Sequence, residues 1–228
     1  MRQPRLLVSS LMGVSLLFVA GCGGSDSDGA ASNDGPATVE GTEATHQPNP
    51  YPRVVISTTL GDITVKLDHE KAPLTVDNFL KYVESGFYTD TIFHEVRRGD
   101  VIIGGGFTKD LEEKPAQYPQ VRNEAHNGLK NVRGTIAMVR RPDVIDSSTS
   151  QFFFNLADNS DYLDPVPLKE GEQFAQFPEK YGYCVFGEVI SGLEVLDEIG
   201  KQDVADNGGL FRDLPKRLVV IKQVRRVK

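Results

Sequence analysis

The chain has 228 residues and a formal net charge of −7, so it lacks the basic surplus that would neutralise nucleic-acid phosphates. Its 39% hydrophobic and 25% charged residues are typical of a globular protein with one domain plus appendages, or with two small domains. Two cysteines are too few for a disulfide framework.

The N-terminus has the pattern of an export signal. Arg2 and Arg5 precede an apolar run at residues 6–19, which is shorter than the roughly 20 residues that a membrane span needs. The run ends in VAGC, which resembles a bacterial lipobox with Cys22 as the lipidated residue. A plain secretory signal with a chance cysteine is the alternative. We expect residues 1–21 to be a lipoprotein signal peptide.

A polar tether follows the signal. Residues 23–50 are mostly Gly, Ser, Asp, Asn, Thr and Pro, and such a segment cannot bury enough surface to offset its chain entropy. We therefore expect residues 22–52 to be a lipidated cysteine and a disordered tether, and residues 53–228 to be the folded domain. Cys184 lies in an apolar run of that domain, which indicates a buried hydrophobic residue and not a nucleophile.

The folded domain reads as many short strands and two helices. Residues 54–58 and 63–67 are rich in β-branched residues and flank a turn segment at Leu60-Gly61-Asp62, which predicts a hairpin. Helical spacing predicts a helix over residues 72–83, with Pro73 in its first turn and Gly86 after its end. Further strands or apolar blocks are predicted at residues 93–96, 101–103, 134–139, 150–155, 181–190 and 218–224, with a second helix at 193–199. This order indicates a mainly β fold, a closed antiparallel barrel capped by two helices.

One segment carries a family resemblance. Residues 93–107 read FHEVRRGDVIIGGGF and resemble the signature of cyclophilins, which in bacterial members is roughly FHRVIPGFMIQGGGF. The blocks SQFFFN at 150–155 and YGYCVFGEVI at 181–190 follow in the family's order, so the resemblance covers residues 53–228. It implies a cyclophilin barrel and peptidyl-prolyl cis-trans isomerase activity. The signature matches at Phe93, His94, Val96, Gly99, Ile102, Gly104, Gly105, Gly106 and Phe107.

The resemblance also implies where substrate binds. Phe153 would form the floor of the proline pocket, Tyr181 is the aromatic candidate for the wall that a tryptophan often supplies, and Arg140 would lie at the rim. For each aromatic residue, ordinary barrel core is the alternative. The substrate-binding residues expected on this basis are His94, Asp100, Val101, Ile103, Val139, Arg140, Gln151, Phe153, Tyr181 and Tyr183.

The catalytic position departs from the family pattern. Glu95 replaces the family's arginine, while Asp100 and Ile103 replace a pocket phenylalanine and glutamine. An ionised glutamate only accepts hydrogen bonds, so losing the charged donor predicts a rate loss on the order of a hundredfold or more. Arg97 lies on the same face of the strand, about 6.6 Å along, and is a candidate substitute donor. The alternative is that Arg97 pairs with Glu95 or Asp100 at the surface.

Two functional hypotheses follow from these residues. The first is a peptidyl-prolyl cis-trans isomerase that assists folding of exported proteins in the cell envelope, with activity reduced by Glu95. The second is a non-catalytic cyclophilin-fold module that binds proline-containing segments. The residue at position 95 favours the second, and the retained Phe153, Gln151 and His94 favour the first.

Partners and location are expected from the same signals. Rotation about a prolyl bond needs no cofactor or metal, and His46, His69, His94 and His126 lack metal-ligand spacing. We expect a monomer with no nucleic-acid partner, which binds proline-containing segments of unfolded or exported proteins. A lipid anchor would hold it in the envelope, facing the periplasm. Gly23 is not the Asp that marks inner-membrane retention in Gram-negative systems, which favours the outer membrane.

Overall fold

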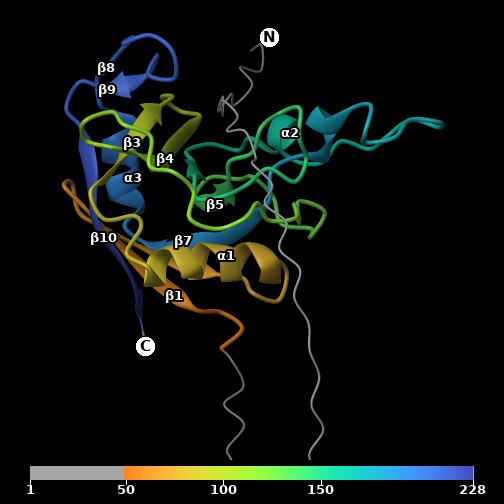
Figure 1. The fold of residues 1–228 in the computed structure, drawn as a ribbon, viewed down its shortest axis with the longest axis horizontal. Helices are drawn as coiled ribbons and strands as arrows, with labels where there is room; N and C mark the ends of the chain where they lie inside the picture. The colour runs from red at the N-terminus through yellow and green to blue at the C-terminus, as the bar shows by residue number, and fades with distance from the viewer. Residues whose placement is uncertain (1–48, 228) are drawn as a thin grey trace, which may run out of the picture. The chain divides into compact units, whose positions relative to one another are not determined.

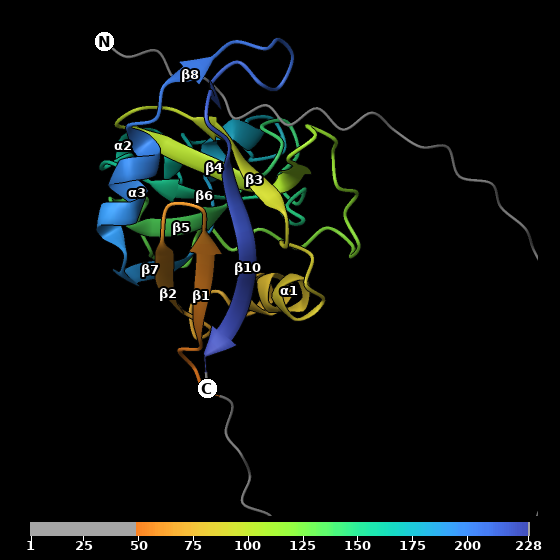
Figure 2. The same ribbon diagram turned by 90° about the vertical axis from the view of Figure 1, so that its left-hand side faces the viewer.

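Eight antiparallel strands close into a barrel in a computed structural model that describes residues 49–227. The neighbours around the barrel run β1-β10-β3-β4-β6-β5-β7-β2. Figures 1 and 2 show the barrel from two sides. The strands are β1 (Arg53–Thr58), β2 (Asp62–Leu67), β3 (Thr91–Val96), β4 (Val101–Thr108), β5 (Thr135–Met138), β6 (Phe152–Asn155), β7 (Val185–Ser191) and β10 (Val219–Val227). The expected mainly β, cyclophilin-like closed antiparallel barrel is confirmed.

The two expected helices are present, as α1 (Pro73–Glu84) and α3 (Leu193–Gly200). Pro73 takes the first position of α1, where its missing N–H costs no helical hydrogen bond. Four smaller elements were not predicted, namely α2 (Ser160–Leu163), the 3-10 turn η1 (Pro178–Tyr181), and the two-stranded sheet of β8 (Val204–Ala205) and β9 (Leu214–Pro215). Among residues 49–227, no helix has the length and apolar character to cross a bilayer.

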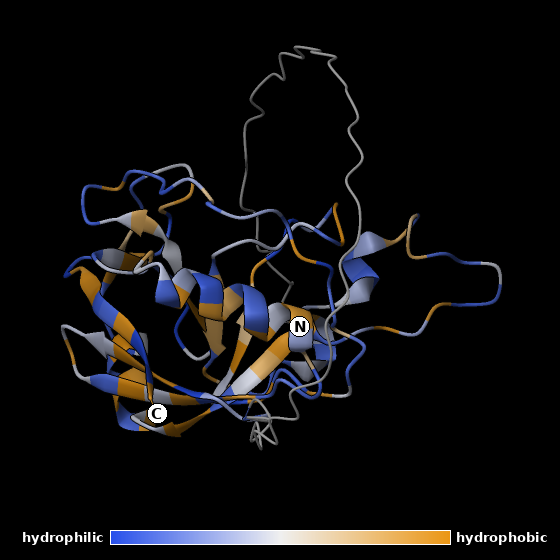
Figure 3. Cartoon of the chain, turned by 60° about the horizontal axis from the view of Figure 1, so that its bottom comes forward, coloured by the Kyte–Doolittle hydropathy of each residue, from blue (hydrophilic) through white to orange (hydrophobic). Residues whose placement is uncertain are grey.

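The barrel interior is filled by aromatic and branched side chains. The ring of Phe79 in α1 lies 5.7 Å from that of Phe152 and 5.2 Å from that of Phe186, and other apolar side chains of the helix are buried in the same core. Leu196 and Ile199 of α3 are fully buried in the same core. Bands of hydrophobic and hydrophilic residues along the strands are visible in Figure 3. In β2, buried residues alternate with more exposed ones, as expected for a strand with one face toward the core.

Order begins slightly before the expected boundary at Arg53. The carbonyl of Pro50 accepts a hydrogen bond from the His69 N–H, and that of Pro52 accepts one from the Leu67 N–H. Residues 49–52 are therefore bound to the end of β2, although the sequence placed them in the tether. The expected signal peptide, Cys22 and residues 23–48 lie outside the described residues.

Candidate functional site

A second apolar cluster lies on the outside of the barrel. On β4, β5 and β6, residues such as Ile102, Met138 and Phe152 point into the barrel core, and their neighbours point outward. We call the outward group the outer cluster; it consists of Val101, Ile103, Ala137, Val139, Phe153, Leu163, Tyr183 and Val185. The structure thus brings together five residues that the sequence placed in the substrate surface.

The outer cluster is well packed. The Phe153 and Tyr183 rings meet edge to face with centroids 5.8 Å apart. Phe153 is fully buried, so a proline ring reaches it only when the groups that cover it move aside. An apolar surface of this kind on the outside of a barrel suits the apolar ring of proline.

A β-bulge sets the direction of position 95. Phe93 pairs with Gly104 and Glu95 pairs with Ile103, so His94 is an extra residue on β3. Phe93 and Val96 both belong to the barrel core, and the two residues between them therefore face outward. The bulge places Glu95 beside Ile103 at the edge of the outer cluster.

Glu95 is paired with Arg97. The Arg97 Nε–H donates to Glu95 Oε1 at 2.5 Å, and the side chains are 14% and 18% exposed. Burial raises the pKa of Glu95 above its ordinary value, the Arg97 guanidinium opposes that rise, and the carboxylates of Asp213 and Asp100 add to it. Of the two arrangements considered for Arg97, the structure has the one in which it pairs with Glu95.

Gln151 and His94 border the site as neutral polar groups. A Cβ at Gly106 would lie 2.5 Å from carbons of the Gln151 side chain, so this glycine makes room for Gln151 to lie across β4. The His94 ring lies 4.6 Å from that of Phe107, and its buried Nδ1 has no hydrogen-bond partner. Burial lowers the pKa of His94 to about 3, which keeps the ring neutral.

Tyr162 is a site residue that the sequence analysis missed. Its hydroxyl donates to Asp100 Oδ1, which joins α2 to the β3–β4 turn beside Val101, and its side chain is 39% exposed. Leu163, its neighbour, belongs to the outer cluster. The sequence offered no signal for it, because Tyr162 is positioned by the short helix α2, which the sequence analysis did not predict.

Tyr181 lies outside the outer cluster. It packs on the rings of His126 and Phe174, at 4.6 and 5.0 Å, and joins the periphery of the barrel core. The structure does not bring it into the outer cluster. Tyr162 takes the place that the sequence analysis assigned to Tyr181, as the aromatic residue at the edge of the site.

Arg140 is not at the rim. Its side chain is buried, with the residue 2% exposed, and its guanidinium donates to backbone carbonyls. Burial lowers the pKa of Arg140, and the nearby Tyr183, Glu179 and Asp143 oppose that shift. Two of these carbonyls belong to the adjacent Arg141 and Pro142 and three to residues 178–182, and these contacts bury the guanidinium that the sequence analysis expected at the rim.

The described residues give little support to a metal site or to a cysteine nucleophile. Within residues 49–227, no group of three or more His, Cys, Asp or Glu side chains is placed to hold a metal ion. Burial raises the pKa of the Cys184 thiol to about 12, so it stays protonated at neutral pH.

Comparison with known proteins agrees with this geometry. The family model described as cyclophilin type peptidyl-prolyl cis-trans isomerase/CLD matches residues 53–226. The chain is 45% identical over 175 residues to peptidyl-prolyl cis-trans isomerase A of Dickeya dadantii, covering 77% of this chain and 84% of that protein. It is 44% identical over 171 residues to peptidyl-prolyl cis-trans isomerase B of Escherichia coli, covering 75% of this chain and 97% of that protein.

The fold also has solved counterparts. A crystal structure of a cyclophilin type peptidyl-prolyl cis-trans isomerase from Cryptosporidium parvum matches with a TM-score of 0.59 at 22% identity, covering 78% of this chain and 98% of that one. Barrel, signature segment and sequence relatives agree, and the chain therefore belongs to the family of cyclophilin-type peptidyl-prolyl cis-trans isomerases.

Proposed function

We propose that this isomerase binds proline-containing segments of exported proteins at the outer cluster and turns them over slowly. Rotation about a prolyl bond crosses a barrier of about 18–20 kcal/mol, because amide resonance is broken on the way. A catalyst lowers this barrier by holding the proline ring and by donating a hydrogen bond where charge develops. The outer cluster supports the first task, and position 95 lacks the residue for the second.

The ion pair of Glu95 with Arg97 carries the proposal. A carboxylate at 95 accepts hydrogen bonds, and the Arg97 Nε–H that lies beside it is already donated to that carboxylate. Arg97 becomes a substitute donor only if substrate competes successfully with Glu95. Substrate binding is further supported by a relative from Cryptosporidium parvum that was crystallised in the presence of the dipeptide Ala-Pro.

The second candidate is a module that binds such segments without catalysis. The same ion pair favours it, because both of its charges are satisfied internally and neither needs the substrate. The two candidates predict the same peptide affinity and differ only in the exchange rate of the bound prolyl bond.

An exchange experiment separates them. NMR on a proline peptide with the full chain would report both binding and cis-trans exchange, with Phe153→Ala as the control that removes the floor. We expect saturable binding with exchange enhanced measurably but weakly, and both lost in Phe153→Ala. Binding without any enhancement would select the non-catalytic module, and no binding at all would reject both.

We also propose that the protein is a monomer anchored in the envelope through Cys22 and faces the periplasm. The VAGC run at residues 19–22 supports this, and Gly23 favours the outer membrane. More than one acyl chain would give stable attachment. Cys22→Ser should move the protein from the membrane to the soluble fraction, or leave it unprocessed. Wild-type protein that is wholly soluble after lysis would reject the anchor.

A further inference from the structure

The guanidinium of Arg140 is saturated with hydrogen bonds. An arginine side chain has five N–H donors, and here each has a backbone carbonyl as its acceptor. Nε donates to Gly182 at 2.8 Å, Nη1 to Arg141 and Pro142 at 2.9 and 3.1 Å, and Nη2 to Pro178 and Glu179 at 2.8 and 3.5 Å. A lysine could form at most three such bonds, so this position is built for the planar fork of arginine.

These carbonyls come from two separate segments. Arg141 and Pro142 follow β5, whereas Pro178, Glu179 and Gly182 belong to η1 and the turn that leads into β7. Arg140 therefore ties the β5–β6 connection to the return of a long loop that we call the arm, residues 165–181. The arm projects from the barrel beside α2 in Figure 1.

Arg140 also reaches the outer cluster. Its Cζ lies 4.9 Å from the centroid of the Tyr183 ring, and Tyr183 packs edge to face on Phe153. A cation over the face of a tyrosine attracts the ring. The three side chains form a row from the saturated guanidinium to the floor of the proposed proline pocket.

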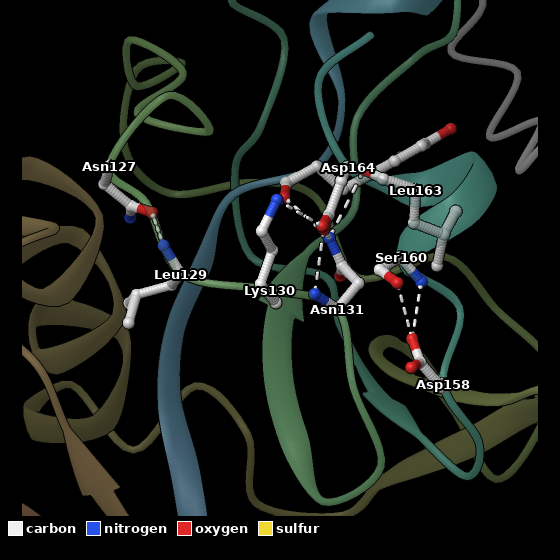
Figure 4. A network of polar contacts seen from close by, with 9 residues as sticks. Asn127, Leu129, Lys130, Asn131, Asp158, Ser160, Leu163 and Asp164 are labelled. Carbon is white, nitrogen blue, oxygen red and sulfur yellow. Dashed lines mark hydrogen bonds and ion pairs between the residues drawn. The ribbon is translucent and has the colours of Figure 1, made fainter.

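The main chain at the base of the arm is held by hydrogen bonds that do not involve Arg140. The Tyr183 N–H donates to the Leu163 carbonyl at 2.8 Å. Asn131 Nδ2 donates to the carbonyls of Leu163 and Tyr183 and to Asp164 Oδ1, and Lys130 Nζ lies 3.2 Å from Asp164 Oδ2. Figure 4 shows this network. Since the network holds the main chain without Arg140, the loss of Arg140 should disturb the Tyr183 ring and the arm more than the barrel.

We infer that Arg140 is a positioning residue for proline binding, which fixes the Tyr183 ring against Phe153 through its fully hydrogen-bonded guanidinium. The inference rests on the proposed function, since it assigns the outer cluster as the surface that takes the proline ring. Arg140 itself does not touch substrate, because every one of its donors is used within the protein.

Three variants of the full chain test this role. Arg140→Met removes the fork and the charge, and Arg140→Lys keeps a cation but loses at least two hydrogen bonds. Val54→Ala is the control, because it opens a cavity in β1, which lies across the barrel from β6 in the strand order. For each, peptide affinity, bound exchange rate, melting midpoint and the nuclear Overhauser contact between the Tyr183 and Phe153 rings would be measured.

We expect Arg140→Met to weaken peptide affinity about tenfold and to lose the ring contact, with the exchange rate of bound peptide changed less than about twofold. Arg140→Lys should recover part of the affinity. Val54→Ala should lower the midpoint but keep both affinity and ring contact. Arg140 variants that keep wild-type affinity and ring contact, or that lose affinity only as Val54→Ala does, would overturn the positioning role. Failure of the wild-type chain itself to bind peptide would reject the proposed function first, and the role of Arg140 with it.

Discussion

At the scale of single residues, His94 shows how burial decides chemistry. It lies in the signature segment, yet its ring is 4% exposed, packs on Phe107 and has a pKa of about 3. A neutral histidine can contribute a hydrogen bond but no charge at physiological pH. His94 therefore supplies no charge to the site, and Arg97, the cation paired with Glu95, is held by that carboxylate.

The buried His94 makes stability depend on pH. Its ordinary pKa is 6.5 and its folded value is about 3, so between these values the unfolded chain binds a proton that the folded chain does not. Its stabilising contribution is complete above pH 6.5 and is lost as the pH falls toward 3. At about pH 4.5 the loss should be about 3 kcal/mol.

Urea titrations of wild type and His94→Phe at several pH values would measure this. The variant keeps a ring against Phe107 but cannot titrate, so the free energy of unfolding should fall less steeply with acid than in the wild type. Parallel slopes for the two proteins between pH 6.5 and 4.5 would show that His94 is protonated freely in the folded state.

At the scale of elements, two consecutive glycines of β4 lie against different parts of the protein, Gly105 against the barrel core and Gly106 against the candidate site. A Cβ at Gly105, where φ is +81°, would meet the core rings of Tyr88 and Phe152 at 2.8 and 2.9 Å. The atoms nearest to a Cβ at Gly106 would all belong to the Gln151 side chain. The same strand is therefore constrained by the barrel core at one residue and by the site at the next.

The two glycines should respond differently to alanine. Gly105→Ala combines backbone strain with a core clash and should lower the free energy of unfolding by about 2–4 kcal/mol. Gly106→Ala should cost less stability, because Gln151 can swing away, but should weaken peptide binding more. Thermal melts and peptide titrations of both variants would check this, and the opposite ranking would contradict the assignment of Gln151 to the site.

At the scale of the whole molecule, local patterns predicted most of the strands and the two longer helices, whereas the pairing of distant strands, such as β1 with β10, came from the resemblance. Spacing alone did not separate Phe153, Val101 and Val139 from the core, because β4 and β6 are buried along almost their whole length. The resemblance to the cyclophilin signature assigned these residues to the site. Arg140 and Tyr162 could not be placed, because three of the five acceptors of Arg140 lie 38 to 42 positions along the chain and Tyr162 is positioned by the unpredicted α2. Contacts between distant loops leave no periodic signal in the sequence.

The junction with the tether allows a whole-chain prediction. Deleting residues 23–48 should leave the melting midpoint of the domain unchanged, because a polar tether contributes no core. Extending the deletion to residue 52 should lower the midpoint, because the carbonyls of Pro50 and Pro52 accept hydrogen bonds from the His69 and Leu67 N–H groups, respectively. Calorimetry of both deletions would test it. If the deletion of residues 23–48 already lowered the melting midpoint, part of the tether would be packed on the domain.

The central claim, that Glu95 limits turnover but not binding, concerns the difference between the bound substrate and its twisted transition state. An arginine at 95 would restore a charged donor, and Asp213 and Asp100 lie close enough to influence it. The gain should therefore fall short of a complete restoration. Glu95→Gln removes the acceptor without supplying a cation, and is the matched control.

The most direct test is the exchange rate of a bound proline peptide in wild type, Glu95→Arg and Glu95→Gln. We expect Glu95→Arg to exchange the prolyl bond about ten- to a thousandfold faster than wild type, with peptide affinity changed much less and Glu95→Gln recovering little. Arg97→Ala in the wild-type background should remove any residual activity if Arg97 is the substitute donor. A wild-type rate equal to that of Glu95→Arg would contradict the account.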